Sequence, residues 1–210
     1  MARRKLRKKP VPEAITQEEI LNIINSPRLK LETKALLSLM YVTGGRISEV
    51  LLLRPMDIHH SEGEDSIAID MVTKKNKKSK NRVVPVILNP IELEMMRIAK
   101  KYIAAREIKT VDKIFPFGQN KAWRKLKMIK ISIRVTTPEG ERQEEYPLAL
   151  YPHYFRHCRA THFVTLYHLN AFELTNVMGW SDARPAEVYV HLDSSHIADT
   201  MRREYKKKVD

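Results

Sequence analysis

The sequence contains a single cysteine, Cys158, among its 210 residues. An internal disulfide is therefore excluded, and this favours a reducing compartment. No apolar run approaches the roughly 18 residues that a membrane-spanning helix needs. The basic N-terminus is not followed by an apolar segment, so the sequence predicts no secretory signal. Together these absences predict a cytoplasmic protein that does not associate with a membrane.

Acidic residues are also scarce, with 25 Asp and Glu against 38 Lys and Arg, a formal net charge of +13. This surplus favours a polyanionic partner, nucleic acid first and anionic membrane second. Hydrophobic residues make up 43% of the chain, which is enough for a core and argues against global disorder. Six basic residues and no acid fall within residues 1–10. We therefore expect a basic arm or linker over residues 1–12 and one domain over residues 13–210.

The spacing of apolar residues predicts that helices dominate the domain. Thr16 and Glu19 have the spacing of a capping box, so the first helix should begin there. An apolar helix follows from residue 31 and should end at Gly44-Gly45, because glycine favours helix C-termini. Further helices are predicted over residues 46–53, 90–107, 119–130, 152–168, 171–178, 183–190 and 195–207.

Two hairpins are predicted between these helices. Residues 66–72 alternate as a strand does and residues 82–88 are rich in β-branched side chains, so they should pair around a long basic tip. A second hairpin should span residues 131–147 and turn at residues 138–140. The expected fold class is α+β, mainly helical, with a small antiparallel sheet at one edge.

Arg46 opens a predicted helix directly after the glycine pair, where the backbone can approach a ligand closely. Glu49 lies three residues further on the same helix face and can orient the guanidinium. An ordinary ion pair at a helix start explains the two residues equally well when they are taken alone.

The predicted basic tip is a second candidate site. A lysine-rich hairpin tip can simply protect a sheet against aggregation, but the net charge favours contact with nucleic acid. Its candidate DNA-binding residues are Lys74, Lys75, Lys77, Lys78, Lys80 and Arg82.

The segment HYFRH, residues 153–157, gathers three groups that can be cationic. His153 should lie near a helix N-terminus, which favours an anion, and Arg156 shares its face, so the pair suits a phosphate. His153 and His157 also have the i,i+4 spacing of zinc proteases. Tyr154 stands where such a motif has glutamate and no carboxylate ligand follows, so we predict no metal site. A core position for His157 and a surface position for His153 remain the alternative.

Trp180 and Tyr189 lie nine residues apart near the C-terminus, and each is explained by packing when considered alone. Their order after the other motifs is more specific. The segment TGGRISE (43–49), the lysine-rich hairpin, HYFRH (153–157), GW (179–180) and Tyr189 together resemble the tyrosine recombinases, or phage-integrase family. The resemblance spans roughly residues 12 to 205.

This resemblance implies a site-specific DNA recombinase, or integrase, that cleaves and rejoins DNA strands through a 3′-phosphotyrosyl intermediate without a cofactor. Tyr189 would be the nucleophile. Lys74 would be the general acid, with Lys75 or Lys77 as alternatives.

The resemblance also implies how the scissile phosphate would be held. Arg46 and Arg156 would clamp it, and His153 and Trp180 would complete the pocket. The supporting residues would be Glu49 and His157.

The implied partner is double-stranded DNA in the nucleoid or on a virus or plasmid, bound by a tetramer on two sites, with a monomer possible without DNA. Members of the family usually carry a separate core-binding domain, so the chain is either a fragment or a naturally short recombinase. Two other functions remain open. One is DNA relaxation of the type IB topoisomerase kind, and the other is DNA binding without catalysis.

Overall fold

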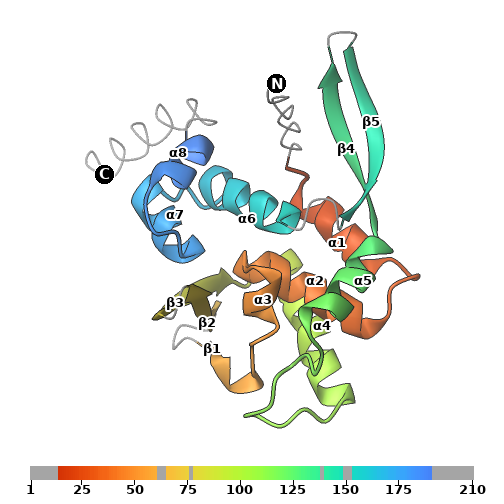
Figure 1. Ribbon diagram of the computed structural model, residues 1–210, viewed down its shortest axis with the longest axis vertical. Coiled ribbons are helices and arrows are strands. Elements are labelled where there is room, and N and C mark those ends of the chain that lie inside the picture. The colour runs from red at the N-terminus through yellow and green to blue at the C-terminus, as the bar shows by residue number, and fades with distance from the viewer. Residues whose placement is uncertain (1–13, 61–64, 76–77, 138–139, 149–152, 191–210) are drawn as a thin grey trace, which may run out of the picture.

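A computed structural model describes residues 14–60, 65–75, 78–137, 140–148 and 153–190 (Figure 1). At residues 73–75 and 78–80, and over most of 131–146, this description covers the backbone alone. The elements in chain order are α1 (Gln17–Asn25), α2 (Leu31–Thr43), α3 (Ile47–Val50), η1 (Pro55–Asp57), β1 (Ile58–His60), β2 (Ser66–Lys75), β3 (Lys78–Ile87), α4 (Pro90–Ala105), α5 (Gln119–Lys127), β4 (Lys130–Thr137), β5 (Gly140–Pro147), α6 (Tyr154–Thr165), α7 (Ala171–Met178) and α8 (Arg184–Val190).

The two N-terminal helices form as their end signals predict. The Thr16 hydroxyl accepts the backbone N–H of Glu19, and the Glu19 carboxylate accepts the N–H of Thr16, which confirms the capping box. Helix α2 ends at Gly44, which takes the left-handed conformation at φ 56°. Most of α2 is buried and packs against α4 and α6, so it forms the centre of the core.

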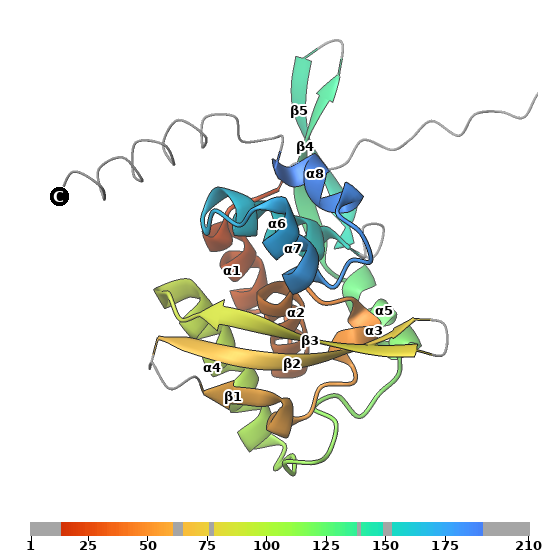
Figure 2. The same ribbon diagram turned by 90° about the vertical axis from the view of Figure 1, so that its left-hand side faces the viewer.

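The sheet has the order β1-β2-β3, is antiparallel, and covers one side of the helices (Figure 2). The expected long basic tip is wrong, because β2 and β3 continue to Lys75 and Lys78, which pair with each other. Backbone hydrogen bonds extend the ladder whatever the side chains, so a run of lysines does not end it. Strand β1 was not predicted, because His59 and His60 give no strand signal and β1 forms by pairing with β2.

The second predicted hairpin is confirmed as β4 and β5, which pair from Lys130↔Pro147 to Thr137↔Gly140. Its predicted turn residues 138 and 139 lie outside the described residues. Figure 1 shows the hairpin projecting away from the body of the molecule. Among the residues that the structure describes, none of β4 or β5 lines the pocket that is presented below.

The C-terminal helices α6, α7 and α8 pack on one another, and α7 lies against β3 (Figure 2). Asn170 caps α7 with Glu173 and the helix has its predicted bounds. Helix α6 is shorter than predicted, with caps at His153 and Leu166. The predicted helix over residues 195–207 lies outside the described residues. The mainly helical α+β class is confirmed, and no helix in the described ranges is long and apolar enough to cross a membrane.

Candidate active site

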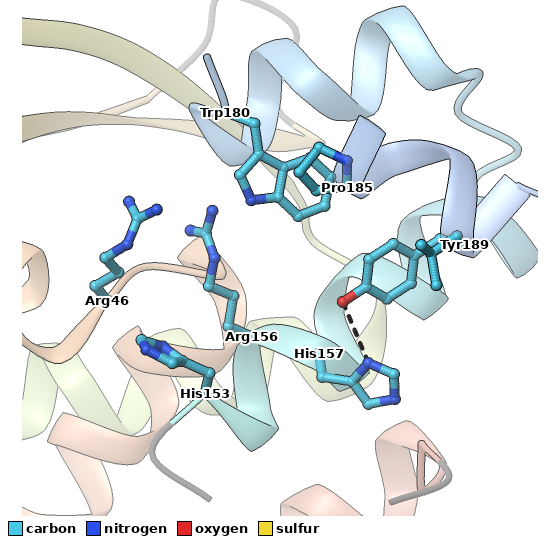
Figure 3. A pocket seen from close by; sticks show the side chains of 8 residues that line it. Arg46, His153, Arg156, His157, Trp180, Pro185 and Tyr189 are labelled. Atoms are coloured by element: carbon cyan, nitrogen blue, oxygen red, sulfur yellow. Dashed lines mark hydrogen bonds between the residues drawn. The ribbon is translucent and has the colours of Figure 1, made fainter. Parts of the chain in front are cut away.

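A pocket of about 380 Å³ lies where the start of α3, the start of α6 and the α7–α8 segment meet (Figure 3). It brings together five of the six predicted catalytic residues. The sixth, Lys74, lies near the end of β2, where the structure describes only the backbone. The lining residues are Arg46, His153, Arg156, His157, Trp180, Pro185, Val188 and Tyr189.

Arg46 is the N-cap residue of α3, and Glu49 fixes it there. Its backbone N–H donates to Glu49 Oε2 over 2.9 Å and its Nη1 donates to Oε1 over 2.7 Å. Burial would raise the pKa of Glu49, but the hydrogen bonds from Arg46 and the charge of Arg82 hold that pKa below its ordinary value. Glu49 therefore stays ionised and orients the Arg46 side chain, which is 34% exposed, at the pocket.

Arg156 lies in the first turn of α6 and is fixed by two backbone carbonyls. Nη1 donates to Gly44 O over 2.7 Å and Nη2 donates to Met178 O over 2.6 Å. A guanidinium has five N–H donors, so three remain for another acceptor. Burial, together with the charges of Arg46 and Arg82, lowers the pKa of Arg156 to about 9, so the group is still charged at neutral pH. In Figure 3 the guanidinium groups of Arg46 and Arg156 point to the same side of the pocket.

His153 precedes α6 and lies beside both arginines. Burial, together with the positive charges of Arg156 and Arg46, lowers the pKa of His153. The imidazole is therefore neutral at pH 7, where it donates one N–H without adding charge.

Tyr189 enters the pocket from α8. Its ring stacks on Trp180 with centroids 5.8 Å apart and planes 16° apart, and the Arg156 Cζ atom lies 5.5 Å from the Trp180 ring centre. The Tyr189 hydroxyl lies 3.2 Å from His157 Nδ1. Burial raises the pKa of Tyr189 against the opposing charge of Arg156, so the phenol is protonated at rest. His157 can accept that proton when its Nδ1 is unprotonated.

The spacing of His153 and His157 raised a zinc site as an alternative. Helix α6 directs His157 toward Tyr189, whereas His153 lies beside Arg46 and Arg156 (Figure 3). Among the described residues, no group of three or more His, Cys, Asp or Glu could hold a metal ion.

The lysines of the first hairpin stay predictions. Lys74 and Lys75 end β2, and Lys78 and Lys80 lie at the start of β3, so their backbones belong to the ladder. Lys77 lies outside the described residues.

Arg82 differs from its expected role as a surface contact for DNA. It is only 7% exposed, its Nη2 lies 3.3 Å from Glu49 Oε2, and its Nη1 donates to the Val177 carbonyl. The alternation of β3 explains this position, because Arg82 shares the inner face with Val84 and Val86. Arg82 therefore forms part of the wall behind the pocket.

Several contributors to the pocket were missed in the sequence. Pro185 and Val188 line it, and their proximity to Tyr189 in sequence was the available signal. The carbonyls of Gly44 and Met178, which hold Arg156, carry no side-chain signal at all.

The family model described as "Phage integrase family" matches residues 13–196. Tyrosine recombinase XerD of Halalkalibacterium halodurans is 28% identical over 204 residues, which cover 91% of this chain and 61% of that protein. Tyrosine recombinase XerA of Pyrococcus furiosus is 24% identical over 197 residues, covering 93% and 63%. The chain thus spans about three fifths of the length of these curated relatives.

Solved structures show the same fold. The XerH site-specific recombinase bound to difH substrate in a pre-cleavage complex matches with a TM-score of 0.61 at 18% identity, over 90% of this chain and 52% of that one. The crystal structure of XerA recombinase matches with a TM-score of 0.59 at 19% identity, over 94% and 66%.

Proposed function

Because this chain belongs to the phage integrase family, we propose that it is the catalytic domain of a site-specific tyrosine recombinase that cleaves duplex DNA through Tyr189. One observation carries the proposal. The Tyr189 hydroxyl shares a pocket with two fixed arginines and lies within hydrogen-bond distance of His157. The domain would cover residues 13–210 and follow a basic arm.

The proposed reaction is a displacement at phosphorus. The Tyr189 oxygen forms a bond to phosphorus, and the bond from phosphorus to the 5′ oxygen breaks. The phenol proton passes to His157 Nδ1, and a hairpin lysine, Lys74 first, donates a proton to the leaving 5′ oxygen. The products are a 3′-phosphotyrosyl ester and a 5′-hydroxyl. The reverse attack by a 5′-hydroxyl of another strand rejoins DNA without ATP or a cofactor.

Charge stabilisation would come from the fixed donors of the pocket. Negative charge grows on the non-bridging oxygens during displacement, and Arg46, Arg156 and His153 all have N–H groups available there. Glu49 and two backbone carbonyls already hold the arginines, so little reorganisation is needed when the charge develops. Removal of one such donor typically slows a reaction by about 10²–10³-fold.

We infer that the partner is double-stranded DNA in the cytoplasm, on the chromosome or on a mobile element. Strand exchange would require four protomers on two sites, with a monomer possible in the absence of DNA. The basic hairpin, including Lys75, Lys77, Lys78 and Lys80, would contact the phosphates near the pocket.

The proposal is tested with a pool of duplexes that carry a central nick and randomised flanks. The nick lets the short cleaved strand diffuse away, so a covalent protein–DNA adduct accumulates and its sequence can be read. We expect adducts with the wild-type chain and none with Tyr189→Phe, because phenylalanine lacks the nucleophile. Tyr102→Phe is the matched control, since Tyr102 hydrogen-bonds Glu32 outside the pocket. Adducts at normal yield in Tyr189→Phe would overturn the proposal.

A further inference from the structure

Arg82 is buried behind the pocket and contacts both of its sides. On one side its Nη2 lies 3.3 Å from Glu49 Oε2, and Glu49 in turn holds Arg46. On the other side its Nη1 donates to the carbonyl of Val177, in the last turn of α7. Two arms of one guanidinium thus join α3 to α7.

The aliphatic stem of Arg82 lies against the end of α7. Gly179 follows α7 with a φ of 65°, and a Cβ atom placed there would lie 2.6 Å from Arg82 Cδ. The side chain of Arg82 therefore passes directly beneath Gly179, where only glycine fits. The residues on either side of Gly179 both serve the pocket, since Met178 O accepts from Arg156 and Trp180 stacks on Tyr189.

The burial of Arg82 is unfavourable in isolation. Burial lowers the pKa of Arg82, and its Nε has no hydrogen-bond partner among the described residues. A buried donor without a partner destabilises a fold, and a buried polar group of this kind calls for a specific explanation. The connection that Arg82 makes between α3 and α7 is such an explanation.

We propose that Arg82 is a positioning residue that holds Arg46, through Glu49, at a fixed separation from the end of α7 and hence from Arg156. This inference rests on the proposed function, in which both arginines bind one phosphate. Arg82 also faces Met71 across the β2–β3 ladder, three residues before Lys74, so the same contacts tie the lysine-bearing hairpin to the pocket. A lysine at this position lacks the planar guanidinium, so it could bind either Glu49 or the Val177 carbonyl well, but not both.

A positioning role predicts a split between binding and catalysis. Because Arg82 is buried, we expect it to make no contact with bound DNA, and Arg82→Met should leave DNA affinity within about threefold of wild type. Cleavage should slow by about 100-fold, the loss expected when a reacting group moves by about 1 Å. Arg82→Lys should recover part of this loss.

The test compares two substrates made on the duplex recovered from the nicked pool. One carries the ordinary phosphate, and the other carries an uncharged methylphosphonate at the scissile position, which needs less charge stabilisation. The defect of Arg82→Met should shrink from about 100-fold to less than about tenfold on the methylphosphonate, as should that of Arg46→Ala. Arg159→Met is the matched control, since it breaks another buried arginine–glutamate pair, and any loss it shows should be equal on both substrates.

Two outcomes would overturn the inference. An equal defect of Arg82→Met on both substrates would assign Arg82 to folding alone. A fall in DNA affinity that accounts for the whole loss of rate would assign it to DNA contact.

A second measurement does not depend on cleavage. Binding of inorganic phosphate to the pocket can be followed by the fluorescence of Trp180 in a Trp123→Phe background. Arg82→Met should weaken phosphate binding by about tenfold, the effect of disturbing one charge-assisted hydrogen bond, and Arg159→Met should not. Unchanged phosphate affinity in Arg82→Met would reject the inference, whereas the absence of a wild-type adduct would reject only the proposed function.

Discussion

Two buried glutamates, Glu92 in the core and Glu49 behind the pocket, each pair with arginine in different surroundings. Glu92 is fully buried and binds both arms of Arg159, which is 1% exposed. Its other hydrogen bonds come from the neutral groups of Tyr167 and Gln17. One negative and one positive charge therefore balance within the core.

Around Glu49 the balance is different. Arg46 and Arg82 both bind this one carboxylate, and Arg156 lies close enough for the charges of Arg46 and Arg82 to lower its pKa. The surplus positive charge faces a pocket lined by the partly exposed Arg46. A balanced pair suits the interior of a fold, whereas an unbalanced group beside a pocket suits an anionic ligand.

The largest effect is expected at the unbalanced site. Arg46→Ala and Arg156→Ala should each slow cleavage of the nicked duplex by about 10²–10³-fold, because each removes a charged donor from the transition state. Lysine at either position should restore little of the rate, since the fork geometry is lost. Adduct formation rates under single-turnover conditions measure this, and a wild-type rate in either alanine variant would place the pocket elsewhere.

Breaking the balanced pair of Arg159 and Glu92 should lower the stability of the fold. Arg159→Met leaves Glu92 buried without its main partner and should lower the free energy of unfolding by about 3–5 kcal/mol. The double variant Arg159→Met with Glu92→Leu removes both charges and should regain most of that loss. Urea unfolding measures both variants. A double variant no more stable than Arg159→Met alone would show that the pair is worth more than two apolar side chains.

Acid should weaken the core before it affects the pocket glutamate. His162 lies 2.7 Å from the Tyr41 hydroxyl, and burial together with the charge of Arg159 lowers the pKa of His162 to about 4. An unfolded histidine has a pKa near 6.5, so between these values the unfolded chain binds more protons. The free energy of unfolding should fall by up to roughly 3 kcal/mol as the pH drops from about 6.5 to about 4.

The pKa of Glu49 is depressed below its ordinary value, so its contribution to the free energy of unfolding is fully present above that ordinary value and is lost as the pH falls through the depressed one. The control is His162→Gln, which should reduce the dependence above pH 4 to the part that His153 contributes, since the pKa of His153 is lowered as well. An undiminished slope in this variant would show that another group is responsible.

The smallest effect is expected at the hairpin. If its lysines meet phosphates, DNA affinity should fall with salt by a log–log slope of about 0.9 for each contact. Replacing Lys77, Lys78 and Lys80 together by alanine should flatten the slope, whereas replacing Lys100, Lys101 and Lys109, which are exposed lysines in α4 and shortly after it, should not. Equal slopes in the two triple variants would remove the hairpin from the DNA interface.

The sequence predicted those parts of the molecule that depend on local spacing. Asn170 with Glu173 set the start of α7, and the i,i+3 spacing of Arg46 and Glu49 placed a carboxylate under the first arginine. The presence of β1 and the full length of β2 and β3 depend on pairing between separate segments. The local sequence of each segment does not show which partner it pairs with.

Arg82 shows the same limit within the site. Its place in a run of basic residues suggested a surface contact, although the alternation of β3 put it on the inner face. Its partners, Glu49 and the Val177 carbonyl, lie 33 and 95 residues away in sequence. Only the folded chain reveals that this charge lies behind the pocket.

The most direct test of the central claim is to identify the amino acid joined to DNA. The trapped adduct is digested with protease and nuclease, and the modified peptide is sequenced by mass spectrometry. The account predicts a nucleotide joined through its 3′-phosphate to the oxygen of Tyr189, and a free 5′-hydroxyl on the released strand. A nucleotide on any other residue, or a 5′-phosphoryl linkage, would contradict it.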